Sequence, residues 1–173
     1  MFTFISILFI SAMGTLLHFL YDMSNHNKIV GLFAAVNEST WEHIKIGLTP
    51  TFLWSVVDGI IYGSSPNYFL AKLLSILTII ILIPVLFYGY KHITKKDNYI
   101  INILIFYITI IISQILFKVV INLRPINNIS KYLSCIGLFI IFGYYMVLTL
   151  IPIKNFIFRD PISKKYGFKG HTD

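Results

Sequence analysis

Long apolar runs alternate with short polar connections along most of the chain. Five runs reach the roughly 20 residues that a helix needs to cross the hydrocarbon core of a bilayer. They lie at about 2–20, 44–63, 69–90, 98–121 and 132–153. Because lipid cannot hydrogen-bond an open backbone edge, runs of this length are expected to be helical. The pattern predicts an all-α integral membrane protein, a bundle of about five transmembrane helices.

The connections between the runs predict how the bundle is joined. Residues 64–67 read Ser-Ser-Pro-Asn, a turn signal that makes spans two and three an antiparallel hairpin. The first loop, 22–43, is long and contains the short apolar piece 29–36, which cannot cross a bilayer and is expected to be interfacial or re-entrant. The tail, 154–173, is polar and basic. We expect one membrane domain over 1–173, with a long first loop and a basic C-terminal tail.

Composition excludes an ordinary soluble domain. The chain is 57% hydrophobic and only 12% charged, with a mean hydropathy of +0.79, whereas soluble proteins carry about 25% charged residues. The net charge is +7, but the basic residues lie between apolar runs rather than beside stacking aromatic residues. Membrane lipids are therefore the expected partners, and nucleic acid is not. The single cysteine, Cys135, lies within an apolar run and allows no intramolecular disulfide.

The distribution of basic residues predicts an orientation in the cell membrane. With five spans, the first loop, the loop near 91–97 and the tail share one side. Counted with the adjoining ends of the spans, that side holds ten Lys and Arg residues, among them Lys45, against four on the other, among them Lys72. Cytoplasmic segments carry the excess of such residues. We therefore expect the N-terminus outside and the C-terminus in the cytoplasm. The first run has no basic residue before it, which favours a retained span over a cleaved signal peptide.

The densest polar segment opens the second span. Residues 37–45 read Asn-Glu-Ser-Thr-Trp-Glu-His-Ile-Lys, and a helix from Asn37 would place Glu38 and Glu42 on one face with His43 beside them. Such carboxylate and imidazole ligands suit a divalent metal: zinc, iron or manganese. Alternatively, Ser39 and Glu42 form a capping box at a helix start. Capping accounts for Glu42 but leaves Glu38 and His43 without a role.

Two further motifs are expected at the same cytoplasmic face. His18 and Asp22 are four residues apart at the end of the first span, where a carboxylate could orient the imidazole; a helix end emerging among headgroups is the alternative. Asp160-Pro161 follows the last span and is also a turn signal. We predict metal ligands at His18, Glu38, Glu42 and His43, and catalytic residues at Glu38, Glu42, His43 and Asp160.

An acid inside the second span needs compensation. An ionised carboxylate at mid-membrane costs roughly 3 kcal/mol on insertion scales. We expect Asp58 to pair with Lys72 or Lys118, which lie at similar depth. The pair would be either structural or part of a polar pathway.

Three motifs carry a resemblance that runs from end to end of the chain. They are H-x-x-Y-x-x-S from His18, V-N-E-S-x-W-E-H-x-K from Val36, and F-x-D-P-x4-Y-G from Phe158. With them the chain resembles a family of small bacterial multi-pass membrane proteins of unknown function. The chain departs from the expected pattern at Ala35, where a proline would stand. The resemblance implies a bacterial membrane protein and lends no reaction and no substrate.

Three functions remain open on the sequence. The first is a metal-dependent enzyme that acts on a lipid or lipid-linked substrate at the cytoplasmic face. The second is a non-catalytic membrane scaffold or accessory subunit, with the motifs as caps and contact points. The third is a small transporter, in which Asp58 and its lysine partner would matter more.

Overall fold

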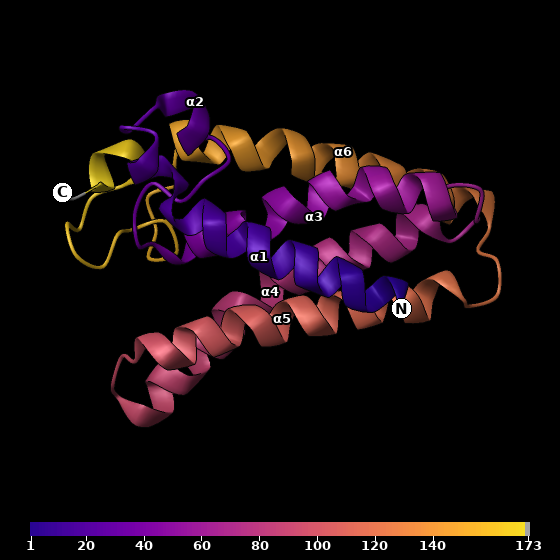
Figure 1. Ribbon diagram of the computed structural model, residues 1–173, viewed down its shortest axis with the longest axis horizontal. Coiled ribbons are helices and arrows are strands. Elements are labelled where there is room, and N and C mark those ends of the chain that lie inside the picture. The colour runs from indigo at the N-terminus through magenta and orange to yellow at the C-terminus, as the bar shows by residue number, and fades with distance from the viewer. Residues whose placement is uncertain (172–173) are drawn as a thin grey trace.

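The computed structural model describes residues 1–171, and over that range the chain forms six α-helices and one short 3-10 helix (Figure 1). A single antiparallel bridge joins Arg159 to Tyr166. The elements are α1 (Phe2–Met23), α2 (Lys28–Gly31), α3 (Thr40–Tyr62), α4 (Tyr68–Thr94), α5 (Tyr99–Ile121), α6 (Asn128–Leu150) and η1 (Gly167–Gly170).

Five of these helices, α1 and α3 to α6, are long and apolar enough to cross a membrane, which confirms the predicted all-α bundle. Several helix ends differ from the sequence prediction by three or four residues, and three of these differences have a local reason. α3 begins four residues early because Ser39 Oγ accepts the Glu42 N–H at 3.4 Å. α6 begins early because Asn127 caps the Ser130 N–H at 2.8 Å. α6 ends at Leu150, two residues before Pro152, because proline disfavours helical geometry in the residue before it.

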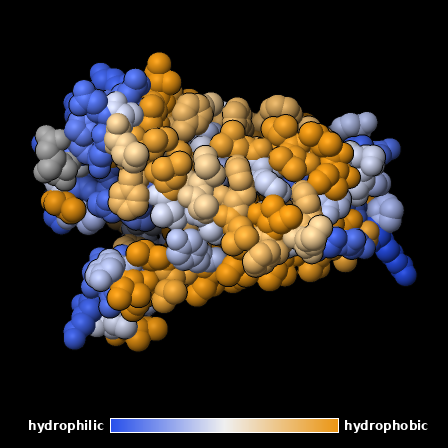
Figure 2. All heavy atoms as spheres, in the orientation of Figure 1, coloured by the Kyte–Doolittle hydropathy of each residue, from blue (hydrophilic) through white to orange (hydrophobic). Residues whose placement is uncertain are grey.

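The helices form two groups that separate at one end. In Figure 1, the α4–α5 hairpin diverges from α1, α3 and α6 at the end that carries α2 and the tail. Elsewhere α4 packs against α3 and α6, and α1 packs against α3 and α5. Figure 2 shows an apolar belt around the middle and hydrophilic residues at both ends. Large apolar side chains such as Ile60 of α3 and Phe139 of α6 are exposed. Lipid contact is the environment that such a surface fits.

A close contact between α1 and α3 sets the position of the site. A Cβ atom added to Gly14 would lie 2.9 Å from the Ile46 carbonyl oxygen, so only glycine allows the two helices to approach this closely. The helices are antiparallel. His18 lies one turn beyond Gly14 on α1, and His43 lies about one turn before Ile46 on α3. Both imidazoles therefore reach the same end of the bundle.

The buried acid of α3 is paired as predicted. Asp58 and Lys72 are both 1% exposed and form an ion pair between α3 and α4. Lys118, the alternative partner, lies over the Tyr62 ring at 5.7 Å. Each buried charge would be costly alone, so the pair is required for either residue to be tolerated.

The C-terminal tail folds back across the bundle. The backbone N–H of Trp41 donates to the Ile157 carbonyl at 3.0 Å. The indole ring of Trp41 stacks on Phe158 with ring centroids 4.8 Å apart. Asn37 Nδ2 donates to the Gly167 carbonyl at 2.9 Å. The tail thus packs on the first turn of α3 and on the loop before it.

The apolar piece of the first loop packs under this tail. It forms the single turn α2, and then the Ala35 N–H donates to the Leu17 carbonyl of α1 at 3.1 Å. Ala34 and Val36 are buried. The first loop and the tail together form a folded cap on the end of α1 and α3.

Candidate functional site

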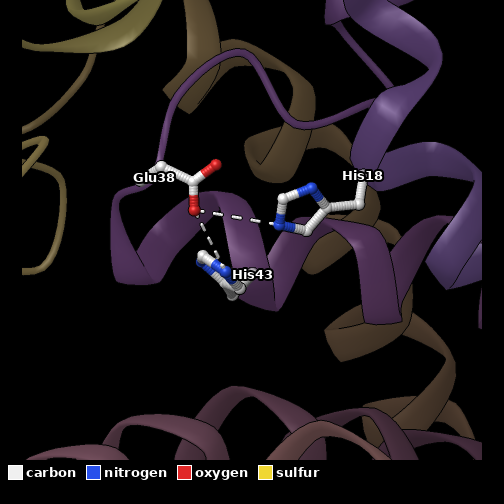
Figure 3. Close-up of side chains that lie close together, drawn as sticks. All are labelled: His18, Glu38 and His43. Atoms are coloured by element: carbon white, nitrogen blue, oxygen red, sulfur yellow. Dashed lines mark ion pairs between the residues drawn. The ribbon is translucent and has the colours of Figure 1, made fainter. Parts of the chain in front are cut away.

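Three side chains from three separate segments converge at the end of α1 (Figure 3). Glu38 Oε2 lies 3.8 Å from His18 Nε2 and 3.7 Å from His43 Nε2. The two imidazole centroids are 5.3 Å apart. His18 comes from α1, His43 from the first turn of α3, and Glu38 from the loop just before the Ser39 cap. The sequence predicted this convergence for these three residues.

The His43 ring is oriented by the backbone. Its Nδ1 lies 3.0 Å from the Ser39 carbonyl oxygen. Because a carbonyl can only accept, Nδ1 must carry a proton, and in the neutral ring Nε2 then presents a lone pair to Glu38. Two acceptors facing each other at 3.7 Å repel unless a proton or a cation lies between them. The arrangement is therefore suited to hold either one.

Asp160 lies behind Glu38 rather than among the three ligand atoms. Its Oδ1 accepts the Glu38 N–H at 3.0 Å. Its Oδ2 accepts the N–H groups of Ile162 and Ser163, which closes the turn at Pro161. The carboxylate is 1% exposed. Asp160 therefore positions the backbone of Glu38, and both of its oxygens are occupied by that task.

The structure does not bring Glu42 to the three ligand atoms. Its Oε2 lies 2.5 Å from Lys45 Nζ and accepts the Val36 N–H at 3.0 Å. Both charged side chains are buried, at 2% exposure or less. The expectation that Glu42 joins His18 in a metal site was therefore wrong. The Glu42 carboxylate is instead paired with Lys45, three residues further along α3.

The capping-box interpretation of Glu42 holds in one direction only. Ser39 Oγ caps the Glu42 N–H. The Ser39 N–H donates to Asn37 Oδ1 at 2.9 Å, whereas in a capping box it would donate to the Glu42 carboxylate. Asn37 thus takes the role that the sequence pattern gave to Glu42.

Asp22 also has partners other than the predicted one. Its Oδ1 lies 3.6 Å from His26 Nε2 and 3.5 Å from His171 Nε2. Sequence reasoning placed Asp22 with His18 and gave His26 and His171 no role. The four-residue spacing of Asp22 and His26 was a local signal that could have paired them. Nothing local points to His171, which lies 145 residues from His26.

Two adjoining cavities of about 290 and 300 Å³ meet at Glu38 and His43. One extends toward α4 along Ile83 and Phe87, and the other reaches α1 and α5 along Phe19. Asn102 and Phe106 of α5 line both. Figure 2 shows a notch at this end, between the polar cap and the tip of the α4–α5 hairpin. Glu38 and His43 thus line both of these mostly apolar cavities, and His18 lines the second.

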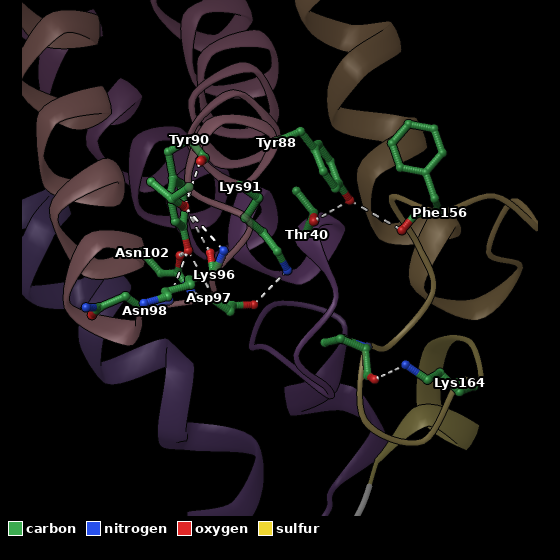
Figure 4. Close-up of polar contacts among 12 residues, drawn as sticks. Thr40, Tyr88, Tyr90, Lys91, Lys96, Asp97, Asn98, Asn102, Phe156 and Lys164 are labelled. Atoms are coloured by element: carbon green, nitrogen blue, oxygen red, sulfur yellow. Dashed lines mark hydrogen bonds and ion pairs between the residues drawn. The ribbon is translucent and has the colours of Figure 1, made fainter.

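Polar contacts secure the walls of these cavities (Figure 4). Tyr88 of α4 shares a hydrogen bond with Thr40 at 2.8 Å and donates to the Phe156 carbonyl at 3.4 Å, which joins α4 to α3 and the tail. At the hairpin tip, Lys91 Nζ lies 2.7 Å from Asp97 Oδ2, and Asn102 donates to Asp97 Oδ1 at 3.0 Å.

Asp97 is the carboxylate of this hairpin tip. Partial burial acts to raise the pKa of Asp97, but hydrogen bonds from Lys91, Asn102 and Tyr90, with the Lys91 charge, outweigh it and hold the pKa below its ordinary value. Asp97 is therefore anionic at neutral pH and ties the end of α4 to the start of α5.

Comparison with known proteins identifies one family. The model of DUF6512, a family of unknown function, matches residues 1–168. No curated protein and no solved structure matches the chain. No reaction is therefore available from a relative, and the site has to be interpreted from its own geometry.

Proposed function

The chain belongs to DUF6512, a family of unknown function, and we propose that it is a metal-dependent membrane enzyme with His18, Glu38 and His43 as its metal ligands. The single observation that carries the proposal is the convergence of three ligand atoms within 4.8 Å of one another on a cavity wall. Two imidazole nitrogens and one carboxylate oxygen are a ligand set of catalytic zinc sites, which leave a further position open for water or substrate.

The exposure of the three side chains supports a catalytic rather than a purely structural ion. The side chain of Glu38 is 45% exposed, and those of His18 and His43 are each 28% exposed. A bound ion would be sheltered by protein on one side and reachable from the cavities on the other. A metal in such a position lowers the pKa of bound water toward neutrality and so supplies a nucleophile. A carboxylate that binds through one oxygen keeps the other to accept a proton.

The shape of the cavities supports the substrate class. Their walls are mostly apolar, with Ile83, Phe87 and Phe106 of the α4–α5 hairpin among them, and Glu38 and His43 line both cavities. A molecule with a polar head and an apolar chain fits such a space. We therefore propose a lipid or lipid-linked substrate, with metal-assisted hydrolysis near its head group as the reaction class. On the basic-residue asymmetry this site belongs to the cytoplasmic face.

The scaffold and transporter alternatives would depend on other residues. Asn37, Glu42 and Asp160 hold the cap together, so a scaffold would need these and not the His18 cluster. Asp58 and Lys72 neutralise each other in a buried pair, which gives a transport role no special support. Only the metal proposal uses the two facing acceptor atoms, Glu38 Oε2 and His43 Nε2, to which the described part of the cap offers no donor.

The test uses the full chain without a histidine tag, purified in detergent, stripped with a chelator and dialysed against zinc, manganese or iron(II). His43→Ala and Glu38→Gln should each lose one metal equivalent by elemental analysis. His92→Ala is the matched control, because this exposed histidine lies at the end of α4 outside the cluster. The loaded protein should release a new product from membrane-lipid vesicles, read by mass spectrometry, and Glu38→Gln should not. Metal content unchanged in both site variants would overturn the proposal.

A further inference from the structure

A second group of ligand atoms lies on the other side of the α1 end. We propose that Asp22, His26 and His171 form a second divalent-metal site, distinct from the first, that ties the C-terminal tail to the end of α1. This inference does not depend on the enzyme proposal, because it uses none of the same residues. Its function is structural: it holds the tail in the position from which Asp160 supports Glu38.

The distances fit one ion. Nε2 of His26 lies 2.8 Å from Nε2 of His171, and Asp22 Oδ1 lies 3.6 and 3.5 Å from these two nitrogens. In a triangle with these sides, one point lies about 2 Å from all three atoms, which is the distance at which zinc binds imidazole nitrogen and carboxylate oxygen. A small divalent ion bound at this point would replace the hydrogen bond between the two Nε2 atoms.

The ring of His171 is oriented as a metal ligand would be. Its Nδ1 lies 3.2 Å from the Val36 carbonyl oxygen, which accepts a hydrogen bond from the Nδ1–H and leaves Nε2 directed at His26 and Asp22. Metal-binding histidines commonly donate their other ring nitrogen to a carbonyl in this way. Tyr21 packs against both imidazoles, with ring centroids 5.3 Å from His26 and 5.2 Å from His171.

The backbone at Asn25 and His26 adopts a conformation that L-residues rarely take. Asn25 has φ of 54° and His26 has φ of 60°, two consecutive left-handed residues without a glycine. This turn brings the His26 N–H to the Tyr21 carbonyl at 3.1 Å and places the imidazole beside Asp22. Unfavourable backbone geometry of this kind persists where surrounding interactions hold it and is often found at functional sites.

All three residues belong to the helix end, the loop and the tail that make up the polar cap. The side chain of Asp22 is 63% exposed, that of His26 42% and that of His171 18%. An ion bound there would exchange with solvent. Two imidazoles and one carboxylate favour zinc, cobalt or nickel over magnesium or calcium.

The site would act on the first cluster through the tail. His171 follows η1, in which Gly170 packs against Asn37, and the same tail carries Asp160. A metal that fixes His171 to α1 would therefore reduce local opening of the segment that positions Glu38. The expected consequence is tighter packing of the tail, measurable without any enzymatic assay.

The experiment titrates zinc into the untagged, chelator-stripped full chain in detergent and counts the bound equivalents. The wild type should bind two, His171→Ala one, His43→Ala one, the double variant none, and the control His92→Ala two. Cobalt(II) should give a visible absorption band from each site, and the His171→Ala and His43→Ala variants should each lose a different component. The two sites can thus be counted separately, so failure of one proposal is distinguishable from failure of the other.

A second readout follows the tail itself. Lys165 and Lys169 are exposed and offer trypsin sites next to the proposed ion. Zinc should slow cleavage there at least several-fold in the wild type and in His43→Ala, and should have no effect in His171→Ala or His26→Ala. The proposal is overturned if His171→Ala binds as many equivalents as the wild type, or if zinc protects the tail equally in both. The variant lies near the C-terminus outside the helical bundle, so the bundle itself does not depend on it.

Discussion

The carboxylate of Asp160 holds the backbone of Glu38 across 122 residues of sequence, through a 3.0 Å bond from the Glu38 N–H to Asp160 Oδ1. Glu38 lies in the loop before α3, and Asp160 lies in the tail after α6. The contact explains how a loop residue can present its side chain to His18 and His43 with a defined geometry. It also makes the tail part of the candidate site without contributing a ligand.

Replacing Asp160 with Asn should weaken metal binding at the His18 cluster. Both oxygens of Asp160 accept N–H groups, and an amide would turn its NH₂ toward one of these donors. Loss of a group that orients a metal ligand typically lowers metal affinity about 10- to 100-fold. Zinc competition with a chromophoric chelator measures the change. Asp97→Asn, the same substitution at a carboxylate that binds Lys91, Tyr90 and Asn102, should leave the affinity unchanged. Equal affinities for wild type and Asp160→Asn would contradict the positioning role.

Replacing Glu42 with Gln should destabilise the protein strongly, because it leaves the Lys45 ammonium buried without its counter-charge. Breaking a buried pair in this way costs about 3–5 kcal/mol. Thermal unfolding in detergent, followed by circular dichroism, should show a clear fall in the midpoint. The double variant Glu42→Gln/Lys45→Met should recover part of it.

Glu38→Gln is the matched comparison for Glu42→Gln, since the same chemical change is made four residues earlier at a half-exposed side chain. We expect its unfolding midpoint to stay close to that of the wild type. If the two single variants lose stability equally, burial does not make Glu42 more important for stability than Glu38. The conclusion that the Glu42–Lys45 ion pair stabilises the fold would then be wrong.

The membrane orientation is testable with reporters. Figure 1 shows the first loop, the α4–α5 connection and the tail at one end of the bundle, as the basic-residue count assumed. Two of the counted residues, Lys45 on one side of the membrane and Lys72 on the other, are held in buried ion pairs. The excess of basic residues on the first side therefore persists without them. A fluorescent protein fused after Asp173 should mature in the cytoplasm. An alkaline phosphatase fusion that is active at that position would reverse the orientation and move the site to the outer face.

Acid should loosen the tip of the α4–α5 hairpin. The pKa of Asp97 is held below its ordinary value of 3.8, so the stabilising contribution of Asp97 is fully present above that value. It is lost as the pH falls through the lower pKa of the folded state. The side chains of Asp97 and Lys91 are 50% and 35% exposed, so the effect on stability should be less than about 1 kcal/mol.

Hydrogen exchange at the Asn98 amide, which donates to Tyr90, reports on this hairpin tip. Protection relative to the unfolded-chain rate should fall below pH 4 in the wild type. In Asp97→Asn it should already be low at neutral pH and should not change with acid. A wild-type protection factor that stays constant down to pH 2 would contradict the assignment.

The sequence alone determined the membrane-spanning architecture. Apolar runs of about 20 residues have one stable solution in lipid, the helix, so length and hydropathy were enough to predict five spans. The cost of a lone charge in a span was likewise enough to predict the pairing of Asp58 with a lysine at similar depth. In both cases the physical rule depends on local composition, which can be read directly from the sequence.

The sequence predicted that His18, Glu38 and His43 converge, but only the tertiary structure decided which neighbouring polar residues join them and which take other partners. Glu42 and Glu38 are both acids in one short motif, yet one is buried against Lys45 and the other faces two imidazoles. Asp22 joins His26 and His171 rather than His18. Periodicity indicates which side chains share a helix face, but partner choice depends on the path of the loop and on a tail more than 120 residues away. Those positions follow from packing, including the Gly14–Ile46 contact, and packing is a property of the whole chain that no local pattern encodes.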